Sequence, residues 1–504
     1  HDSSSPLAMK EEAFEKMNHD LHVTFFPFMA HGHIIPTVDM AKLFADRGVK
    51  TSIITTPCNA RLFTKPLDKA RNLGLDIALH TIRFPTSEAG LPDGCENLDV
   101  VASHGGKLLR NFMEALTLLQ EPLEKLLEET RPDCLVSDMF FPWTLDVTSK
   151  FGISRLVFHG ISYFSLSISR CMLITESDSD LDADPDSVFS VPLLPGDLKF
   201  SGNLIAPGDR PNSSNPFSNV IKASVDADGK SFGVLVNSFY GLDPVYADFY
   251  RNSLKVRAWS IGPVSLFNRE LEDKMIRGGR QAGITDNECL TWLDSKPPNS
   301  VIYVCFGSMS EVSFTQLNQI AMALDASSQN FIWVVRTERK GGEEWLPEGF
   351  EKRTEGKGLL IRGWAPQVLI LEHQAVGAFV THCGWNSTLE AISAGKTMIT
   401  WPLFAEQFYN DKLVTEVLRI GVSLRINGGN LIGGDIVTSE AIGKAIKRVT
   451  VDEEAVHMRS RVKYFAKLAR KAIEPDGSSS REFDSLLNEL AAYSALQLSR
   501  KQSI

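Results

Sequence analysis

The sequence predicts an α/β fold in which two domains, each a parallel β-sheet covered by helices, face each other across a cleft. Three observations support this prediction. With 504 residues, the chain is too long for one ordinary hydrophobic core. Two successive series of short, β-branched apolar runs alternate with stretches of helical spacing. The apolar content of 43% and the charged content of 23% are typical of a globular protein.

The first series of elements lies in the amino-terminal half. Its apolar runs are nearly continuous, as expected for parallel strands that are buried on both faces. The predicted strands cover residues 22–28, 50–56, 76–84, 133–138, 155–159 and 232–237. The predicted helices cover residues 34–46, 98–129 with a break at Pro122, and 144–150.

The second series lies in the carboxy-terminal half and predicts a second parallel sheet. Its strands are expected at residues 300–306, 331–336, 359–362, 376–381 and 398–401, and its first helix at residues 315–326. In such sheets, ligands bind beyond the carboxyl ends of the strands, where the strand order reverses. A cleft between the two sheets is therefore the expected binding site.

The two series meet in a polar segment that contains Gly262-Pro263 and Arg277-Gly278-Gly279-Arg280, and the interdomain linker is placed there. The expected boundaries are 1–20 for a tag remnant and flexible N-terminus, 21–262 for the first domain, 263–285 for the linker and 286–482 for the second domain. Residues 483–504 are expected to form a C-terminal helix that packs back on the first domain.

The charge and the cysteines restrict the classes of partner. The net charge of −10 argues against nucleic acid and anionic membranes, which require clustered Lys and Arg. No apolar run reaches the roughly 18–20 residues that a membrane span needs, and the first residues lack an apolar signal region. The seven cysteines are scattered without a CxxC pair, which favours reduced thiols in a cytosolic chain. We expect a monomer.

The most informative segment is residues 364–407, where two strands and a helix bring polar residues to one place. Trp364 follows a strand and could stack on a base, although a core position would also explain it. His382 and Gly384 lie between a strand and the helix that begins near Asn386 and Ser387. The first backbone N–H groups of a helix lack partners, and they bind anions such as phosphate.

Each polar residue of this segment also has a plainer interpretation. His382 could be structural, Asn386 and Ser387 could cap the helix, and Glu390 could be a solvated carboxylate. Capping and phosphate binding are compatible, because both use the same N–H groups. Ser308 ends the first strand of the second domain, where its hydroxyl could reach a phosphate.

The first domain carries candidates for proton transfer. His31 and His33 follow the first strand, and an imidazole with a pKa near 6.5 can remove a proton from a hydroxyl at neutral pH. Asp138 ends a later strand at the cleft edge, where it could fix the tautomer of a histidine, or cap a helix. Two histidines at this spacing could suggest a metal, but no third ligand follows, so no metal site is predicted.

Residues 364–407 resemble the UDP-sugar signature box of plant family-1 glycosyltransferases, almost residue for residue. Gly32-His33-Ile34-Ile35-Pro36 resembles the Gly-His-x-x-Pro element of that family, and Asp138 matches the Asp of its Leu-Val-x-Asp strand. Leu91-Pro92-Asp93-Gly94-Cys95-Glu96-Asn97 is similar to a subgroup that acts on triterpenoids, flavonoids and related phenolics. The pair Lys396-Thr397 departs from the more common Val-Pro.

The resemblance implies two Rossmann-like domains of the GT-B type and a metal-free reaction in which His33, rather than His31, is the base and Asp138 its partner. It implies glucose as the sugar, because the box ends in Gln407 and retains Trp385. The residues implied to bind the UDP-sugar are Ser308, Trp364, Ala365, Gln367, His382, Gly384, Trp385, Asn386, Ser387, Glu390, Glu406 and Gln407.

The resulting hypothesis is an inverting transferase that uses UDP-glucose, needs no cofactor, and glycosylates a hydroxyl of a small lipophilic plant metabolite. Two alternatives remain. An NAD-dependent oxidoreductase would need a GxGxxG motif after a first-domain strand, and none is present. A catalytically inactive UDP-sugar-binding protein would not need both His33 and Asp138.

Overall fold

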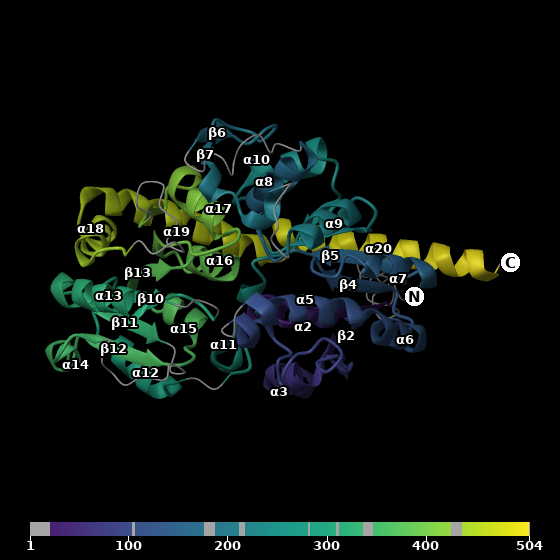
Figure 1. Cartoon of the computed structure of the whole chain (residues 1–504), viewed down its shortest axis with the longest axis horizontal. Helices are drawn as coiled ribbons and strands as arrows, with labels where there is room; N and C mark the ends of the chain where they lie inside the picture. Colours follow the sequence, from purple (N-terminus) through teal and green to yellow (C-terminus); the bar gives the residue numbers. More distant parts are fainter. Residues whose placement is uncertain are drawn as a thin grey trace, which may run out of the picture.

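A computed structural model describes residues 21–102, 106–175, 187–210, 217–280, 283–308, 312–335, 346–424 and 436–502 (Figure 1). The chain forms two parallel β-sheets, one of seven strands and one of six, which lie in two halves side by side. The expected residues 1–20 of a tag remnant lie outside the described residues. Together the two sheets form the pair of Rossmann-like units that the sequence predicts.

The first sheet uses strands from the amino-terminal half in the order β3-β2-β1-β4-β5-β8-β9, and every pairing is parallel. The strands are β1 (His22–Phe26), β2 (Lys50–Thr55), β3 (Ile77–Thr81), β4 (Cys134–Asp138), β5 (Ser154–Phe158), β8 (Gly233–Val236) and β9 (Ala258–Ser260). A short antiparallel pair, β6 (Val188–Ser190) and β7 (Lys199–Ser201), lies outside this sheet.

The helices of this half are α2 (His31–Asp46), α3 (Pro57–Asn72), α4 (Leu98–Val101), α5 (Gly106–Leu118), α6 (Gln120–Thr130), α7 (Thr144–Phe151), α8 (Tyr163–Ile174), α9 (Ser218–Asp228) and α10 (Pro244–Asp248). Single turns of 3-10 helix occur at η2 (Gly202–Leu204), η3 (Pro207–Asp209) and η5 (Val264–Phe267), and a π turn at η4 (Phe249–Ser253).

The second sheet has the order β12-β11-β10-β13-β14-β15 and is also entirely parallel. Its strands are β10 (Val301–Cys305), β11 (Asn330–Val335), β12 (Gly358–Arg362), β13 (Val376–Thr381), β14 (Thr397–Thr400) and β15 (Gly421–Ser423). The helices from the linker onward are α11 (Leu271–Ile276), α12 (Asp286–Asp294), α13 (Phe314–Ser327), α14 (Phe350–Arg353), α15 (Gln367–Glu372), α16 (Trp385–Ser393), α17 (Gln407–Lys412) with π turn η7 (Leu413–Val417), α18 (Ser439–Thr450), α19 (Glu453–Ile473) and α20 (Ser478–Gln502).

The strand order explains where a site can form. In the first sheet the order reverses between β1 and β4, and in the second between β10 and β13. At such a reversal, the loops beyond the carboxyl ends diverge to opposite faces and leave a crevice. The loop before α2 and Asp138 lie at the first crevice, whereas Gly307 and the turn before α16 lie at the second.

Some local predictions were wrong. The helix expected at residues 34–46 begins already at His31, because Ala30 keeps an extended backbone and acts as its N-cap. His33 therefore lies in the first turn of a helix and not at a strand end. The helical stretch expected at 98–129 is three helices, α4, α5 and α6, and the break between α5 and α6 lies at Leu119. Pro122 is tolerated in the first turn of α6, where its missing N–H costs no hydrogen bond.

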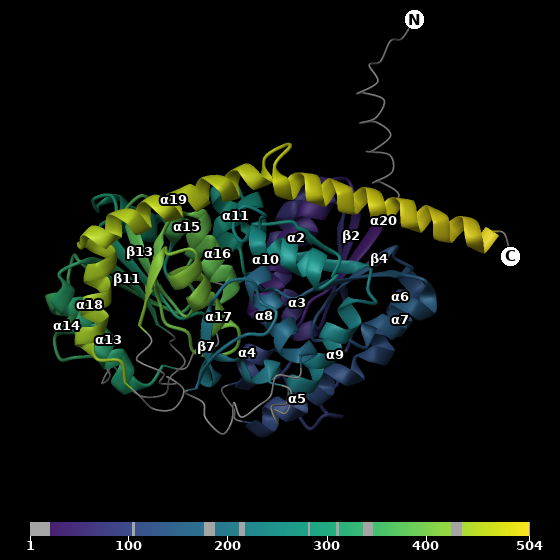
Figure 2. The same ribbon diagram turned by 90° about the horizontal axis from the view of Figure 1, so that it is seen from above.

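The last two helices connect the two halves. Figure 2 shows α19 running along the second half and α20 continuing across the first half to the C-terminus. Phe483, Leu486, Leu487 and Leu490 of α20 belong to the apolar core beneath the first sheet. Arg47 pairs with Asp484, and the Ser479 hydroxyl donates to the Gly262 carbonyl at 2.6 Å. The last helix is thus part of the first half's core.

Candidate active site

A cavity of about 1030 Å³ lies between the two halves and is lined by residues from both. It opens at the carboxyl ends of β1, β4, β10 and β13, where the strand order predicts a crevice. His33 lines it from the first half, and His382, Glu390 and Glu406 line it from the second. The structure therefore brings the candidate residues of the two halves into one site.

His33 and Asp138 form a direct hydrogen-bonded pair. The distance between His33 Nδ1 and Asp138 Oδ2 is 2.7 Å. The Asp138 side chain is fully buried, whereas the His33 side chain is 21% exposed toward the cavity. The other carboxylate oxygen of Asp138 accepts the backbone N–H of Phe140 at 3.1 Å. Because Asp138 accepts from Nδ1, the Nε2 atom of His33 remains for a substrate.

The surroundings of His33 shift its proton affinity. Burial lowers the pKa of the imidazole, but the charge and hydrogen bond of Asp138, followed by the charge of Glu406, outweigh burial and raise it above its ordinary 6.5. The ring packs edge-on against Phe28 and Phe140, which fix its orientation. A base of this kind is strengthened by its carboxylate partner.

His31, the other candidate in the first half, has a different set of partners. Its Nδ1 atom lies 2.6 Å from Asp99 Oδ2, and the side chain is 4% exposed. Burial raises the pKa of Asp99, but the hydrogen bond and charge of His31 outweigh it and lower the pKa below its usual value. The second oxygen of Asp99 accepts the Ser308 hydroxyl at 3.1 Å. Ser308 thus joins the two halves through Asp99 at the cavity wall.

His382 lies at the end of β13 between two glycines. A Cβ atom added at Gly307 would lie 2.6 Å from His382 Cε1, and one added at Gly384 would lie 2.6 Å from His382 Nε2. Burial lowers the pKa of the His382 imidazole to about 4, so the ring is neutral at physiological pH. A neutral imidazole can donate a hydrogen bond to a phosphate oxygen without a change in net charge.

The start of α16 faces the cavity without a side-chain cap. Its N-cap is Gly384, which has no side chain to accept from the first N–H groups. Asn386 donates instead to the Gly32 carbonyl of the first half at 2.7 Å, and Ser387 accepts from Gln367 at 3.0 Å. The capping interpretation of Asn386 and Ser387 is therefore wrong. The uncapped amides and the helix dipole make this turn suitable for an anion.

Glu390 is buried, and each of its two carboxylate oxygens accepts a hydrogen bond from a neighbouring side chain. Arg277 Nη1 donates to Oε1 at 2.5 Å, and Gln367 Nε2 donates to Oε2 at 2.8 Å. The residue is 6% exposed and lines the cavity. The alternative of a solvated helix carboxylate is therefore wrong.

Trp364 is half-buried at the cavity and does not belong to an apolar core cluster of the described residues. Its ring lies 5.8 Å from the ring of His31 and 5.8 Å from the guanidinium carbon of Arg280. The core interpretation of this residue is wrong. The neighbouring Ala365 is buried and does belong to the core, so its methyl group shapes the wall of the cavity.

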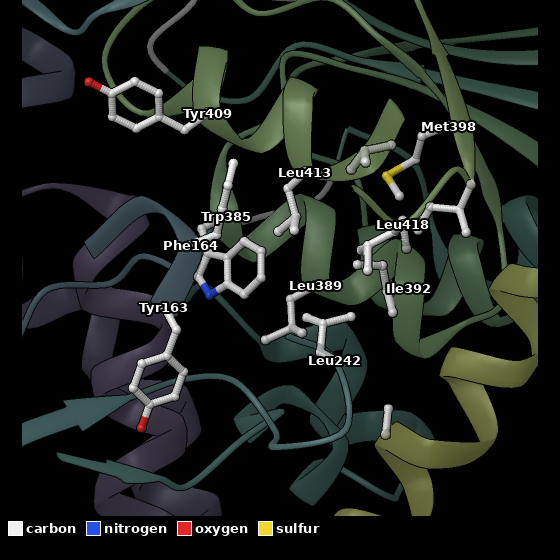
Figure 3. Close-up of a cluster of buried hydrophobic side chains, with 14 of the residues drawn as sticks. Tyr163, Phe164, Leu242, Trp385, Leu389, Ile392, Met398, Tyr409, Leu413 and Leu418 are labelled. Atoms are coloured by element: carbon white, nitrogen blue, oxygen red, sulfur yellow. The ribbon is translucent and has the colours of Figure 1, made fainter. Parts of the chain in front are cut away.

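Trp385 lines the cavity and is also buried against the first half. Figure 3 shows its indole among buried side chains that include Phe164 of the first half and Leu389 of α16. Its Nε1–H donates to the Asn237 carbonyl at 2.8 Å. The indole nitrogen is therefore occupied by a contact between the two halves.

Glu406 and Gln407 lie at the start of α17. Burial raises the pKa of Glu406 to about 6, and the nearby charge of His33 moderates the rise. The Oε1 atom of Gln407 accepts the backbone N–H groups of Leu403 at 2.9 Å and Phe404 at 3.1 Å. The amide oxygen thus holds its own loop, and the NH₂ group is what remains for a sugar hydroxyl.

Arg277 and Arg280 were expected in the interdomain linker and not among the site residues. Both line the cavity. The sequence feature that could have indicated their role is the pair Gly278-Gly279 between them. Both glycines have positive φ, and a Cβ at Gly278 would lie 2.6 Å from the Trp364 ring. Two glycines in such close approach mark a packed segment instead of a flexible one.

The remaining wall of the cavity belongs to the first half and is mainly apolar. A buried pair, His159 and Asp228, lies on this wall with a distance of 3.0 Å between Nε2 and Oδ2. The apolar lining includes Phe28, Met139, Phe140, Ile161, Leu166, Phe217 and Ile221. This wall fits a lipophilic molecule with few polar groups.

Among the residues that the structure describes, no group of three or more His, Cys, Asp or Glu side chains is arranged to hold a metal ion. Within the same ranges, none of the helices combines the length and the apolar character needed to cross a bilayer.

Two facing parallel-sheet units, with an uncapped helix in one and a histidine–carboxylate pair in the other, define a nucleotide-sugar transferase of the GT-B class. The pattern of the family described as UDP-glucoronosyl and UDP-glucosyl transferase matches residues 280–463. The chain belongs to the plant family-1 UDP-glycosyltransferases. It is a glycosyltransferase, and a UDP-sugar is its donor substrate.

Similarity to individual proteins extends over nearly the whole chain. Scopoletin glucosyltransferase of Nicotiana tabacum is 51% identical over 94% of this chain and 99% of its own length. UDP-glucose flavonoid 3-O-glucosyltransferase 7 of Fragaria ananassa is 49% identical over 93% of this chain and 96% of its own. The crystal structure of Glycyrrhiza uralensis UGT73P12, complexed with glycyrrhetinic acid 3-O-monoglucuronide, superposes with a TM-score of 0.87 at 40% identity, covering 96% of this chain and 98% of that one.

Replacing Gly384 with alanine should weaken UDP binding by about 1–3 kcal/mol, roughly 5- to 150-fold in Kd. The backbone of Gly384 suits any residue, but the new methyl would lie 2.6 Å from His382 Nε2 and displace the ring. Calorimetric titration with UDP measures the effect. Gly443→Ala is the matched control, since its methyl meets no heavy atom within 4 Å. Equal UDP affinity in both variants would contradict the role of the glycine.

Proposed function

We propose that the chain is an inverting glucosyltransferase that moves glucose from UDP-glucose to a hydroxyl of a small lipophilic phenolic or triterpenoid acceptor. The observation that carries this proposal is the pair His33–Asp138, at 2.7 Å, on the wall of a cavity that the uncapped start of α16 also lines. A base and an anion site in one cavity are the two requirements of direct displacement at a sugar carbon.

In the proposed reaction, the acceptor hydroxyl gives its proton to His33 Nε2, and its oxygen forms a bond to the anomeric carbon. The bond from that carbon to the diphosphate oxygen breaks on the opposite face, so the configuration inverts. Asp138 stabilises the imidazolium that forms on His33. The amides of α16 and the neutral His382 stabilise the charge that develops on UDP.

The donor roles follow from the positions of the side chains. Trp364 offers a ring face for uracil, and Glu390 offers its remaining lone pairs to the ribose hydroxyls. Asn386, Ser387 and Ser308 surround the diphosphate position. Glu406 and the NH₂ group of Gln407 bind the sugar hydroxyls, whereas Trp385, Ala365 and Gln367 support the site through the contacts that bury or hold them.

The acceptor class rests on the apolar wall and on the relatives. Phe28, Phe140 and Phe217 offer aromatic faces to a planar or polycyclic molecule. Two relatives are named for glucosyl transfer to scopoletin and to flavonoids, and one solved relative holds a triterpenoid glucuronide. An inactive binding protein is not favoured, because it would have no use for an intact histidine–aspartate pair.

The compartment proposed for the enzyme is the cytosol, and the assembly proposed is a monomer. None of the seven cysteines, all of which the structure describes, forms a disulfide, as expected in a reducing compartment. Asn386-Ser387-Thr388 matches the N-x-[ST] sequon of N-glycosylation. The Asn386 side chain donates to the Gly32 carbonyl of the first half, so a glycan at this position would separate the two halves.

The test is the transfer of labelled glucose from UDP-glucose to members of a panel of phenolic and triterpenoid acceptors, with products identified by mass spectrometry. A product whose mass increases by one hexose, with the β configuration by NMR, supports the proposal. Retention of the donor without product on any acceptor supports a binding protein, and an α-linked product excludes inversion.

Gln407 should determine the choice of sugar. In competition at equal concentration, UDP-glucose should exceed UDP-galactose and UDP-glucuronic acid, and Gln407→His should reduce glucose transfer by about 10- to 100-fold, the scale of one or two hydrogen bonds. Because Gln407 also holds Leu403 and Phe404, a Gln407→Glu control keeps the accepting oxygen but loses the NH₂ donor. If galactose or glucuronic acid is preferred by the wild type, the assignment of Gln407 is wrong.

A further inference from the structure

Arg277 lies in the segment between the two halves, yet its side chain is only 10% exposed. Its guanidinium contacts one carboxylate from each half. The Nε and Nη2 atoms lie 2.9 Å from Asp39 Oδ2, and Nη1 lies 2.5 Å from Glu390 Oε1. An arginine keeps its charge when it is buried, and its planar guanidinium can bind two carboxylates at once.

The position of Glu390 is fixed by these contacts. A carboxylate has about four acceptor sites, two on each oxygen. Arg277 takes one on Oε1 and Gln367 takes one on Oε2, which leaves one on each oxygen toward the cavity. Two adjacent acceptor sites on two oxygens match the two neighbouring hydroxyls of a ribose.

The other end of the bridge reaches the helix that carries the base. Asp39 lies in α2, as His33 does, and its second oxygen accepts Asn268 Nδ2 at 2.7 Å. Asp39 is 2% exposed, so this contact is sheltered from water. The chain of contacts Glu390–Arg277–Asp39 therefore joins the donor wall of the cavity to α2.

We propose that Arg277 is a positioning residue of the donor site, which orients Glu390 toward both ribose hydroxyls and fixes that carboxylate relative to α2. The inference rests on the proposed donor role of Glu390. Arg277 does not touch the donor; its effect is transmitted through the carboxylate. The enzyme should consequently distinguish ribose from deoxyribose donors only while Arg277 holds Glu390.

The experiment compares kcat/KM for UDP-glucose with kcat/KM for 2′-deoxy-UDP-glucose in the wild type and in variants. The wild type should favour the ribose donor by about 10- to 100-fold, the scale of a hydrogen bond to a charged group. Arg277→Met should reduce this preference to within about 3-fold, mainly by raising KM for UDP-glucose. Arg277→Lys, whose compact ammonium matches only one carboxylate well, should fall between them.

Two further variants make the outcomes distinguishable. Lys274→Met removes another cation of the linker segment, which pairs with Glu372 at 2.6 Å, and it should keep the full ribose preference. Glu390→Gln should lose the preference, and adding Arg277→Met to it should cause no further loss.

The possible results separate the inference from the proposed function. If Glu390→Gln keeps the ribose preference, the donor role of Glu390 fails. A second outcome concerns Arg277. If Glu390→Gln loses the ribose preference, but both Arg277 variants keep it and lose kcat/KM equally on the two donors, Arg277 is only structural. The inference is then overturned. Should Arg277→Met fail to fold, as a lowered melting temperature would reveal, Arg277→Lys and Asp39→Asn decide the question by the same ratio.

Discussion

Replacing His33 with alanine should reduce turnover by about 10²- to 10⁴-fold, the usual contribution of a positioned general base. The acceptor proton would then have no group within reach, because Nε2 of His33 is the nitrogen that its pair with Asp138 leaves open to the cavity. Initial rates at saturating UDP-glucose measure the loss. Calorimetry should find UDP binding nearly unchanged, since the residues proposed to bind UDP lie in the other half.

The pH profile provides a second test of the same residue. The pKa of His33 is raised above 6.5, and only the neutral imidazole accepts a proton. The wild-type kcat/KM should therefore fall as the pH is lowered through that raised pKa. The profile of His33→Ala should lack this decrease, which forms the acidic limb of the wild-type profile. Near wild-type turnover of His33→Ala on an aliphatic hydroxyl would show that His33 is not the base and would favour His31.

Asp138→Asn should preserve the packing but reduce turnover by about 10²- to 10⁴-fold. An uncharged amide cannot stabilise the imidazolium, and its NH₂ can donate to Nδ1 and so place the ring proton on Nε2. Asp138 is also the main cause that raises the pKa of His33, so the acidic limb of the profile should move to lower pH. The melting temperature distinguishes this effect from general damage.

A matched control exists for the aspartate. Asp99→Asn disturbs the equivalent pair of His31, at 2.6 Å, without touching His33. The acidic limb should move far less than in Asp138→Asn, because the charge of Asp99 contributes less than that of Asp138 to the raised pKa of His33. If Asp138→Asn has full activity, or if Asp99→Asn moves the limb and Asp138→Asn does not, the assignment of the dyad is wrong. A phenolic acceptor, which is more acidic than an aliphatic alcohol, should depend less on Asp138.

Much of the fold was predictable because the buried parallel strands are nearly continuous apolar runs. The predicted strand at 376–381 has the bounds of β13, and the strand at 133–138 differs from β4 by one residue. Short strands such as β9 and β15, with three residues each, carry too little pattern to be distinguished from loops. The early start of α2 depends on Ala30, which has no capping side chain that a pattern could reveal.

The candidate site was predictable where a residue follows directly from its strand or turn. His33, Asp138, His382 and Gly384 lie at strand ends or helix starts, and these positions are local. Contacts with distant partners were not predictable: Trp385 donates to Asn237, which is 148 positions away, and Arg277 reaches Glu390 over 113 positions. A local sequence pattern does not contain a partner that lies so far away in the sequence. A polar segment that is predicted to be a linker can therefore be a buried part of the site.

The path of α20 has a consequence for the order in which the protein assembles. Phe483, Leu486, Leu487 and Leu490 complete the core of the first sheet but are synthesised after every strand of both sheets. Domains usually fold in the order of their synthesis, the N-terminal one first. Here the core of the earlier unit stays incomplete until α20 has been synthesised, and chimeras that exchange acceptor halves between relatives should carry residues 478–502 along. The N-terminal half is synthesised first, but its hydrophobic core is completed last.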